Sequence, residues 1–425
     1  MKASRRILLL QGPPTPFWHE LGLAFRREGA DVRRVLLCPG DRLAWKGAAV
    51  SYRGRLRGWG DWLTRLVSRE AITDIVVYGD QQPYHRDAGR LARRLGLGFF
   101  VIEFGYLRPG WLTLERGGMG ARSHVPNDPA TIRRLAGNLP ETLPAPTFAH
   151  RTATEALSET LFVVANEVLR PFYPFYSTQS SVNPIIDYAS TILRWRRQWS
   201  RHADDARVLA RAAGGGWPFV LLPLQLQTDS QIRWNSPWRD LRDMLDAVFA
   251  SFARHAPPDL NLLLKVHPLD VGLVDWARTA ASLALGHGLS ERVATVDGGD
   301  LAALLRACRG VVLVNSTVGL HAIRAGRPVK ALGAAVYDIP GLTHQGPLES
   351  FWTRPEPVDA ALASDFVRVL AHTVQVAGSF YVPEGRRLAI DTMVSRILEN
   401  RVNEPGAFVD PPPRLATALA SGVPD

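Results

Sequence analysis

Cysteine is scarce in this sequence, with only Cys38 and Cys308 among 425 residues. Two thiols are too few to build a disulfide framework, and they lack the spacing of metal ligands. This composition fits a reducing cytoplasm. No apolar run approaches the roughly 18 residues that a membrane span requires. Only four apolar residues, Ile7 to Leu10, follow the basic start, which is too short for a secretion signal and predicts a first strand.

Several motifs of nucleotide-binding proteins and hydrolases are also missing. The sequence contains no Walker A motif, no HExxH and no Gly-x-Ser-x-Gly, and Gly12 is not part of a GxGxxG fingerprint. There is no Asp-x-Asp either, so a metal-dependent sugar-nucleotide site is not expected. Any nucleotide would have to be bound by a different set of residues.

Lysine is rare as well, because it occurs only at positions 2, 46, 265 and 330, and the net charge of +10 comes almost entirely from arginine. A basic protein attracts anions such as a nucleic acid, a nucleotide donor or an acidic lipid surface. No recognisable nucleic-acid-binding motif accompanies the charge, so a nucleic-acid partner is not expected.

The length predicts two domains, since one ordinary core does not hold 425 residues. Strand and helix signals alternate in both halves, which predicts an α/β fold with two Rossmann-like domains and parallel sheets. The expected boundaries are an N-terminal Rossmann-like domain at 1–150, a helical connector at 151–216, a C-terminal Rossmann-like domain at 217–403 and a poorly ordered, proline-rich tail at 404–425.

In the first half, two predicted strands end in polar residues. One end is Tyr78 to Arg86, and the other begins at Glu103. Burial at the end of an apolar strand would raise the pKa of Glu103 and suit it to proton transfer; the alternative is a structural acceptor for backbone N–H groups. Arg108 could hold a phosphate or carboxylate through two hydrogen bonds, or form a surface ion pair of little consequence.

In the second half, three predicted strands end in groups that suit an anionic ligand. These groups are Asp229 with Gln227, Ser230 and Gln231, then Lys265, His267 and Pro268, and finally Asn315, Ser316 and Thr317. Each group has a plain structural alternative, such as a helix N-cap or a structural His-Pro turn. Together, after three strands of one sheet, they favour a nucleotide-phosphate pocket. Two α/β halves with such a pocket in the second half describe a glycosyltransferase of the two-domain B type.

Aromatic residues alternate with arginine in two segments, 170–176 and 194–202. Such a mixture suits a membrane interface. The alternative is a helix between domains with a solvated basic face.

The sequence resembles the bacterial capsule polysaccharide biosynthesis family of the KpsS/LipB type. The matching pieces run in order from about residue 7 to about residue 352, and they depart from the expected pattern at Gly110, where an acidic residue is expected after Arg108-Pro109. They are Leu10-Gln11-Gly12-Pro13, Tyr52-Arg53-Gly54, Tyr78-Gly79-Asp80, Pro83-Tyr84-His85, Glu103 to Pro109, Trp111 to Glu115, Gln227 to Gln231, Lys265 to Pro268, Asn315 to Leu320 and Gly341-Leu342-Thr343.

This resemblance implies a retaining β-Kdo transferase that uses CMP-Kdo and starts the Kdo linker between a capsule polysaccharide and a phosphatidylglycerol-type lipid at the inner membrane. The implied nucleophile is Asp229, and Glu103 is the implied base for the acceptor hydroxyl. Lys265 and His267 would balance the phosphate and carboxylate of the donor, and Asn315, Ser316 and Thr317 would bind CMP. The other implied donor-binding residues are Gln227, Ser230, Gln231 and Pro268. The implied acceptor-binding residues are Gln11, Asp80, His85, Tyr106 and Arg108.

The scheme needs no metal and no cofactor, because cationic and helix-end groups take the place of a metal. Its expected partners are a nucleotide-sugar donor, a lipid acceptor, an anionic membrane surface and the capsule export machinery, and its expected location is the cytoplasmic side of the inner membrane. Two alternatives remain open: a transferase for another sugar nucleotide, and a non-catalytic export or assembly factor for capsule polysaccharide.

Overall fold

The computed structural model describes residues 5–143, 148, 152–177 and 184–424. The chain forms two compact units. Unit 1 consists of residues 1–126, 134–179 and 367–413, and unit 2 of residues 127–133, 180–366 and 414–425.

Unit 1 is built on a seven-stranded sheet in the order β12-β6-β5-β4-β1-β2-β3. Strands β1 to β5 pair in parallel, β6 is antiparallel to β5, and β12 is antiparallel to β6. The strands are β1 (Arg6–Leu9), β2 (Asp31–Leu36), β3 (Val50–Ser51), β4 (Asp74–Tyr78), β5 (Gly98–Phe104), β6 (Trp111–Arg116) and β12 (Gln375–Ala377).

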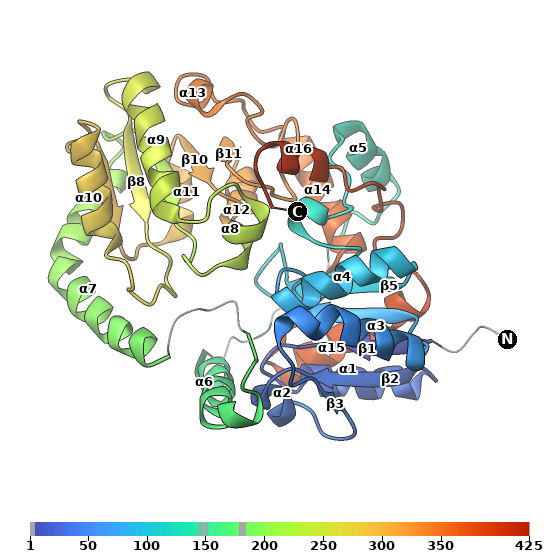
Figure 1. Ribbon diagram of the computed structural model, residues 1–425. Helices are drawn as coiled ribbons and strands as arrows, with labels where there is room; N and C mark the ends of the chain where they lie inside the picture. Colours follow the sequence, from blue (N-terminus) through green and yellow to red (C-terminus); the bar gives the residue numbers. More distant parts are fainter. Residues whose placement is uncertain (1–4, 144–147, 149–151, 178–183, 425) are drawn as a thin grey trace. The chain divides into compact units, whose positions relative to one another are not determined.

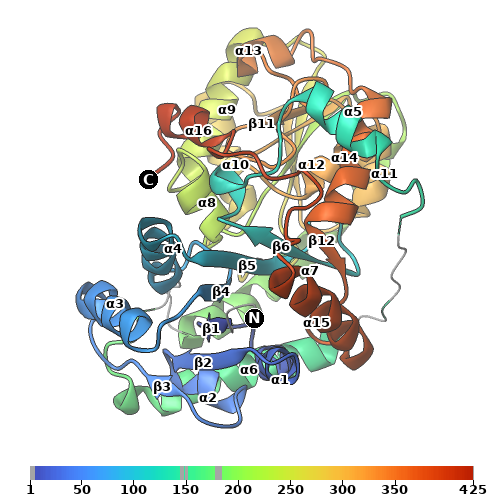
Figure 2. The ribbon, with the colours of Figure 1, turned by 90° about the vertical axis from the view of Figure 1, so that its right-hand side faces the viewer.

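Helices cover both faces of this sheet, because its central strands are apolar on both sides. Residues of α1 (Phe17–Arg27) and α15 (Pro383–Leu398) share one core with the sheet, and residues of α3 (Trp59–Arg69) and α4 (Pro83–Leu95) share the other. Figure 2 shows α3 and α4 on one side of the sheet and α15 on the other. The remaining helices of this part of the chain are α2 (Pro39–Leu43), η1 (Leu56–Gly58), η2 (Gly120–Arg122), α5 (Pro129–Gly137), α6 (Thr152–Val168) and η3 (Arg170–Phe172).

The C-terminal part of the chain differs from the expected domain boundaries. Residues 367–413 pack with unit 1, although 217–403 was expected to form one domain. Strand β12 extends the first sheet beside β6, and Ile390 and Met393 of α15 are buried in its core. Arg386 of α15 also donates to both carboxylate oxygens of Glu20 in α1, at 2.8 and 2.9 Å. Strand β12 and helix α15, which are far from β1 to β6 in the sequence, therefore complete the first sheet and its core.

Unit 2 is built on five parallel strands in the order β11-β10-β7-β8-β9. They are β7 (Phe219–Pro223), β8 (Asn261–Lys265), β9 (Val293–Val296), β10 (Gly310–Leu313) and β11 (Val329–Ala331). Figure 1 shows this sheet beside α9 (Leu241–His255) and α10 (Trp276–Gly286), with the long helix α7 (Pro184–Ala213) at its edge. The other helices are α8 (Ser230–Asn235), α11 (Leu301–Ala307), α12 (Val318–Arg324), α13 (Leu348–Phe351) and α16 (Leu415–Ala420). Helix α14 (Ala360–Thr373) begins in unit 2 and ends in unit 1. Two α/β units with mainly parallel sheets confirm the predicted fold class.

The tail from 404 onward is more regular than its proline content suggested. It contains helix α16, and Ala407 and Ala418 are buried. The ring of Phe408 stacks on His124, with ring centroids 4.1 Å apart, and Arg414 donates to the carbonyl of Val336. These contacts replace the regular backbone pairing that proline prevents. Within the described residues, no helix combines the length and the apolar character of a membrane span.

Candidate functional site

The sheet of unit 2 reverses its strand order between β7 and β10. The chain runs from β7 to β8 and β9 on one side, and β10 and β11 lie on the other. In open α/β sheets, ligands bind outside the carboxyl ends of the strands at such a reversal. The sequence places Asp229 shortly after β7 and Asn315 shortly after β10, so both lie at this point.

One side chain joins these two residues. Gln225 donates from Nε2 to Oδ1 of Asn315 at 3.0 Å and to Oδ2 of Asp229 at 3.3 Å. Its Oε1 accepts from the backbone N–H of Asn315 at 3.2 Å. The structure thus brings Asp229 and Asn315 together, and it adds Gln225 to the candidate site, which the sequence motifs did not predict. Its position directly after a buried strand was the available signal.

Asp229 also caps helix α8, which is the structural role that the sequence left open beside a catalytic one. Its Oδ1 accepts from the N–H of Gln231 at 2.8 Å. The side-chain amide of Asn315 donates to the carbonyls of Gln231 and Asn235, at 2.9 and 3.2 Å. The carboxylate of Asp229 is partly exposed and held in one orientation. Capping and reaction with a substrate are compatible, because each carboxylate has two oxygens with several lone pairs.

The glutamines beside Asp229 have structural partners. Gln227 accepts the N–H of Leu241 at 3.1 Å, which supports the start of α9, and Gln231 accepts from the side-chain amide of Asn235 at 2.8 Å. The side chain of Ser230 lies outside the described residues. Both glutamines therefore shape the loop, and their contact with a donor remains a prediction.

Lys265 closes strand β8 and is buried, with 7% of its surface exposed. Burial lowers the pKa of its ammonium group, while the nearby Asp297 raises the pKa and Arg194 lowers it. Its ammonium group has no hydrogen-bond partner among the residues that the structure describes. A buried cation in this state is stabilised by an anionic ligand.

His267 follows Lys265 in the loop after β8. Its Nδ1 accepts a hydrogen bond from the backbone N–H of Leu269 at 3.1 Å. Because the backbone amide is the donor, the proton of the neutral imidazole lies on Nε2. His267 Nε2 is therefore a donor, as binding of a phosphate oxygen requires. Pro268 accepts from Arg194 through its carbonyl oxygen at 2.9 Å.

Asn315, Ser316 and Thr317 lead into helix α12. Ser316 Oγ accepts from the N–H of Val318 at 3.2 Å, and Thr317 is the N-cap residue without a side-chain cap bond. The hydroxyl of Tyr337 donates to the carbonyl of Ser316 and fixes the turn from the other side. The ordinary capping role is thus present for Ser316, and a role in binding CMP remains a prediction for all three residues.

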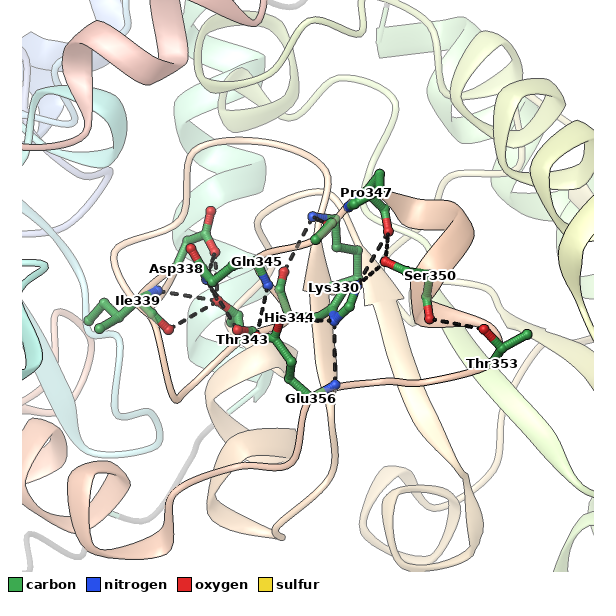
Figure 3. A network of polar contacts seen from close by, with 11 residues as sticks. Lys330, Asp338, Ile339, Thr343, His344, Gln345, Pro347, Ser350, Thr353 and Glu356 are labelled. Atoms are coloured by element: carbon green, nitrogen blue, oxygen red, sulfur yellow. Dashed lines mark hydrogen bonds and ion pairs between the residues drawn. The ribbon is translucent and has the colours of Figure 1, made fainter.

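A second polar network holds the loop after β11 (Figure 3). Lys330 donates to the carbonyls of His344 and Gly346 at 3.3 and 2.6 Å, and burial lowers the pKa of its ammonium group. Thr343 donates to Asp338 at 2.6 Å and accepts from the N–H of Ile339 at 3.2 Å. The Gly341-Leu342-Thr343 motif therefore has a structural role, because it fixes the loop that carries Tyr337.

In unit 1, Glu103 lies at the carboxyl end of β5 and is partly exposed, whereas the sequence predicted a buried carboxyl group. Its Oε1 accepts from the N–H of Phe104 at 3.0 Å. Gly79, at the end of the neighbouring β4, has a φ of +64°, and a Cβ there would lie 2.8 Å from Oε2 of Glu103. Any side chain at position 79 would collide with the Glu103 carboxylate, so glycine is needed there.

Asp80 and His85 hold the loop after β4. Asp80 is buried, burial raises the pKa of its carboxyl group, and its Oδ2 accepts from the N–H of Met119 at 2.9 Å. The ring of His85 is fully buried, and its Nδ1 lies 2.8 Å from the carbonyl of Gly79 and 3.1 Å from that of Tyr78. Burial lowers the pKa of His85 to about 4, so the ring is neutral at pH 7.

The burial of His85 predicts acid sensitivity. Above pH 6.5 the ring is neutral in both the folded and the unfolded chain; between pH 6.5 and about 4 only the unfolded chain binds the proton, so stability falls with pH. The full loss is on the order of 3 kcal/mol, at about 1.4 kcal/mol per pKa unit. The midpoint of urea unfolding at pH 7 and pH 5 checks this, with His85→Asn expected to lose less. An equal loss in both proteins would contradict the assignment.

Three further residues were predicted to bind an acceptor. Gln11 is buried and donates to the hydroxyl of Tyr176 at 2.9 Å and to Cys38 Sγ at 3.1 Å. Tyr106 donates to the buried Glu115 at 2.6 Å. Arg108 is exposed, donates to the carbonyl of Gly105 at 3.1 Å and lies over the ring of Phe104. Of the five predicted residues, Arg108 has the exposure that direct contact requires, whereas Gln11 and His85 lie inside the unit.

The structure gives three arginines of the segment 194–202 a carboxylate partner. Arg194 pairs with Asp297, and Arg197 and Arg201 pair with Asp275, all within unit 2. Arg194 is mostly buried in its pair, whereas Arg197 and Arg201 remain 40% and 37% exposed, so a solvated side is retained and lipid binding by this segment remains a prediction. Trp199 remains 89% exposed, and in the segment 170–176 the rings of Phe172 and Phe175 are exposed.

No group of three or more His, Cys, Asp or Glu side chains suited to a metal ion occurs within the described ranges. Polar side chains gather instead at the carboxyl ends of parallel strands, beside the reversal of strand order. This arrangement defines an α/β protein with Rossmann-like units and a candidate site for an anionic ligand.

The chain belongs to the capsule polysaccharide biosynthesis protein family, whose model matches residues 73–381. It is 31% identical over 384 residues to the capsule polysaccharide export protein KpsS of Escherichia coli, covering 89% of this chain and 97% of that protein. It is 30% identical to the capsule polysaccharide modification protein LipB of Neisseria meningitidis serogroup B, covering 90% and 93%. Among solved structures, it aligns with the β-Kdo 2,7 transferase of Thermosulfurimonas dismutans KpsC, with 13% identity, a TM-score of 0.44 and coverage of 93% and 99%.

Proposed function

We propose that this protein is a retaining β-Kdo glycosyltransferase that uses CMP-Kdo and builds the Kdo linker on a phosphatidylglycerol-type lipid during capsule polysaccharide biosynthesis and export. The observation that carries the proposal is the constellation at the strand reversal of unit 2. There Gln225 links Asp229 to Asn315. A fixed carboxylate at this place is suited to covalent catalysis on a bound sugar nucleotide.

In the proposed first step, an oxygen of Asp229 attacks the anomeric carbon of Kdo. A bond forms between that oxygen and the sugar, the bond from the sugar to the phosphate oxygen breaks, and CMP leaves with the electron pair. The Lys265 ammonium and His267 Nε2–H stabilise the charge on the leaving phosphate. Asn315, Ser316 and Thr317, which lie between the end of β10 and the start of α12, bind the rest of the nucleotide.

In the second step, the acceptor hydroxyl attacks the same carbon and displaces Asp229 as a free carboxylate. Glu103 takes the proton of that hydroxyl. Two displacements at one carbon retain its configuration. No charge in this sequence of steps requires a metal ion, so we propose metal-independent transfer.

A lipid acceptor places the enzyme at the inner face of the membrane. We propose that it binds there peripherally through exposed aromatic residues such as Phe172, Phe175 and Trp199. The positive net charge of the chain supports attraction to an anionic lipid surface.

A second candidate function is a non-catalytic export or assembly factor for capsule polysaccharide, because the E. coli relative is described as an export protein. A factor of this kind would bind components of the export machinery and would show no turnover with any donor.

One assay separates these functions. The protein is incubated with CMP-Kdo, UDP-sugars or GDP-sugars and with phosphatidylglycerol-containing vesicles, and the linkage of the product is read by NMR. We expect transfer from CMP-Kdo in the presence of EDTA and co-flotation of the protein with the vesicles at low salt. Transfer from another donor alone, or no transfer at all, would overturn the proposed activity, and absence of flotation at low salt would overturn the peripheral binding.

A further inference from the structure

One face of helix α7 contacts the loops at the carboxyl ends of β8 and β9. Arg194, Gln198, Arg201 and Asp205 are spaced by four, three and four residues, so they lie on the same side of the helix. Gln198 donates to the carbonyl of Asp297 at 3.0 Å, and Asp205 accepts from the N–H of Asp297 at 2.9 Å. This face therefore holds two loops of the candidate donor site from outside the sheet.

Arg194 makes the largest set of these contacts. Its guanidinium pairs with both carboxylate oxygens of Asp297, at 3.1 Å from Nε and 2.6 Å from Nη2. The same group donates to the carbonyls of His267 at 3.2 Å and Pro268 at 2.9 Å, and to that of Asp270. Only 12% of the side chain is exposed. A planar fork of five N–H donors is suited to this arrangement, and a lysine is not.

Gly272 shows how closely the helix approaches this loop. Its φ is +76°, and a Cβ at this position would lie 2.6 Å from Cβ of Arg194. The loop itself is closed by Asp270, which accepts from the N–H of Gly272 at 2.7 Å and from Trp276 Nε1 at 3.1 Å. The segment from His267 to Gly272 is thus fixed on one side by its own turn and on the other by Arg194.

Lys265 is the other cation near this cluster; burial lowers the pKa of its ammonium group, and Asp297 lies close enough to raise that pKa. Arg194 is neutralised by Asp297, whereas the Lys265 ammonium has no such ion pair among the described residues. If the Arg194 contacts were lost, the carbonyls of His267, Pro268 and Asp270 would lose their donor and the partly buried Asp297 would lose its partner. The loop would then be free to rearrange.

We propose that Arg194 is a positioning residue for the donor: it fixes the His267–Pro268 turn so that His267 Nε2–H and the Lys265 ammonium present one binding site to a nucleotide phosphate. This inference rests on the proposed function of the site. It assigns the arginine-rich face of α7 to donor binding through the loop, without direct contact between Arg194 and the donor.

The test compares Arg194→Lys and Arg194→Gln with the control Arg207→Gln. Arg207 also belongs to α7, but it is exposed and contacts Asp204 and the carbonyl of Ala203 on its own helix. Calorimetry measures the binding of CMP, UDP and GDP to each variant. Steady-state kinetics give KM and kcat for the sugar nucleotide that the wild type uses as donor. Amide hydrogen exchange is recorded over residues 266–272, with residues 219–224 of β7 as an internal reference for folding.

We expect both Arg194 variants to weaken nucleotide binding and raise the donor KM by about tenfold or more, with a smaller change in kcat, because a displacement near 1 Å in a binding group has effects of this size. Exchange over 266–272 should accelerate while β7 stays protected, and the control should match the wild type. Wild-type binding in Arg194→Lys would show that charge alone suffices and would overturn the proposal. If the wild type binds none of the three nucleotides, the proposed function fails, and unchanged exchange in Arg194→Lys would overturn the positioning role by itself.

Discussion

Replacing Asp229 by Asn is expected to reduce sugar transfer by about a thousandfold or more, the loss seen when a covalent nucleophile is removed. The asparagine side-chain oxygen can still accept from the N–H of Gln231, so the start of α8 should persist. The amide cannot form the glycosyl ester, however. CMP should therefore bind to Asp229→Asn with an affinity close to that of the wild type, as measured by calorimetry, while transfer from CMP-Kdo disappears.

The chain supplies a matched control for this substitution. Asp240 caps α9 in the same way, since its Oδ1 accepts from the N–H of Arg242 at 2.8 Å. Asp240→Asn makes the same chemical change outside the candidate site and should leave transfer unchanged. Asp229→Ala should abolish transfer as well and also cost about 1 kcal/mol of stability, because it removes the cap. Normal turnover in Asp229→Asn, or a Kdo adduct trapped on another residue, would sink the nucleophile assignment.

The candidate site in unit 2 was predictable because its residues lie at the ends of buried strands with apolar centres. Runs such as Leu262 to Leu264 identify buried parallel strands, and in a parallel sheet their carboxyl ends share one edge. The meeting of Asp229 and Asn315 follows from that rule. The choice between a cap and a nucleophile does not, because the geometry of Asp229 serves both roles.

Two features required the structure because they depend on partners that are distant in the sequence. Ile390 and Met393 show that α15 has an apolar side, but this pattern does not reveal which sheet the helix covers. The ion pairs of the α7 arginines also required the structure, since Asp275 and Asp297 lie more than 70 residues farther along the chain. The local sequence shows that a helix face is basic, but it does not show which acidic residues pair with it.

Replacing Glu103 by Gln is expected to reduce transfer to the acceptor by about a hundredfold to ten-thousandfold, the usual contribution of a general base. Glutamine has nearly the same volume, and its Oε1 can still accept from the N–H of Phe104. Space beside Gly79 is retained as well. The change therefore removes the base and leaves the local structure in place.

Variants of the two proposed catalytic residues should differ in the half-reaction that they block. With Asp229→Asn, no CMP should be released from CMP-Kdo, because the first displacement fails. With Glu103→Gln, rapid mixing should show a burst of CMP close to one equivalent per enzyme, followed by slow turnover, and intact-mass analysis should detect the Kdo adduct on the protein. Arg69→Gln, which removes an exposed ion pair with Glu70, is the neutral control in unit 1. If Glu103→Gln transfers sugar at the wild-type rate, the base is another group; if it releases no CMP, Glu103 acts before the acceptor enters and the order of the two steps must be reassigned.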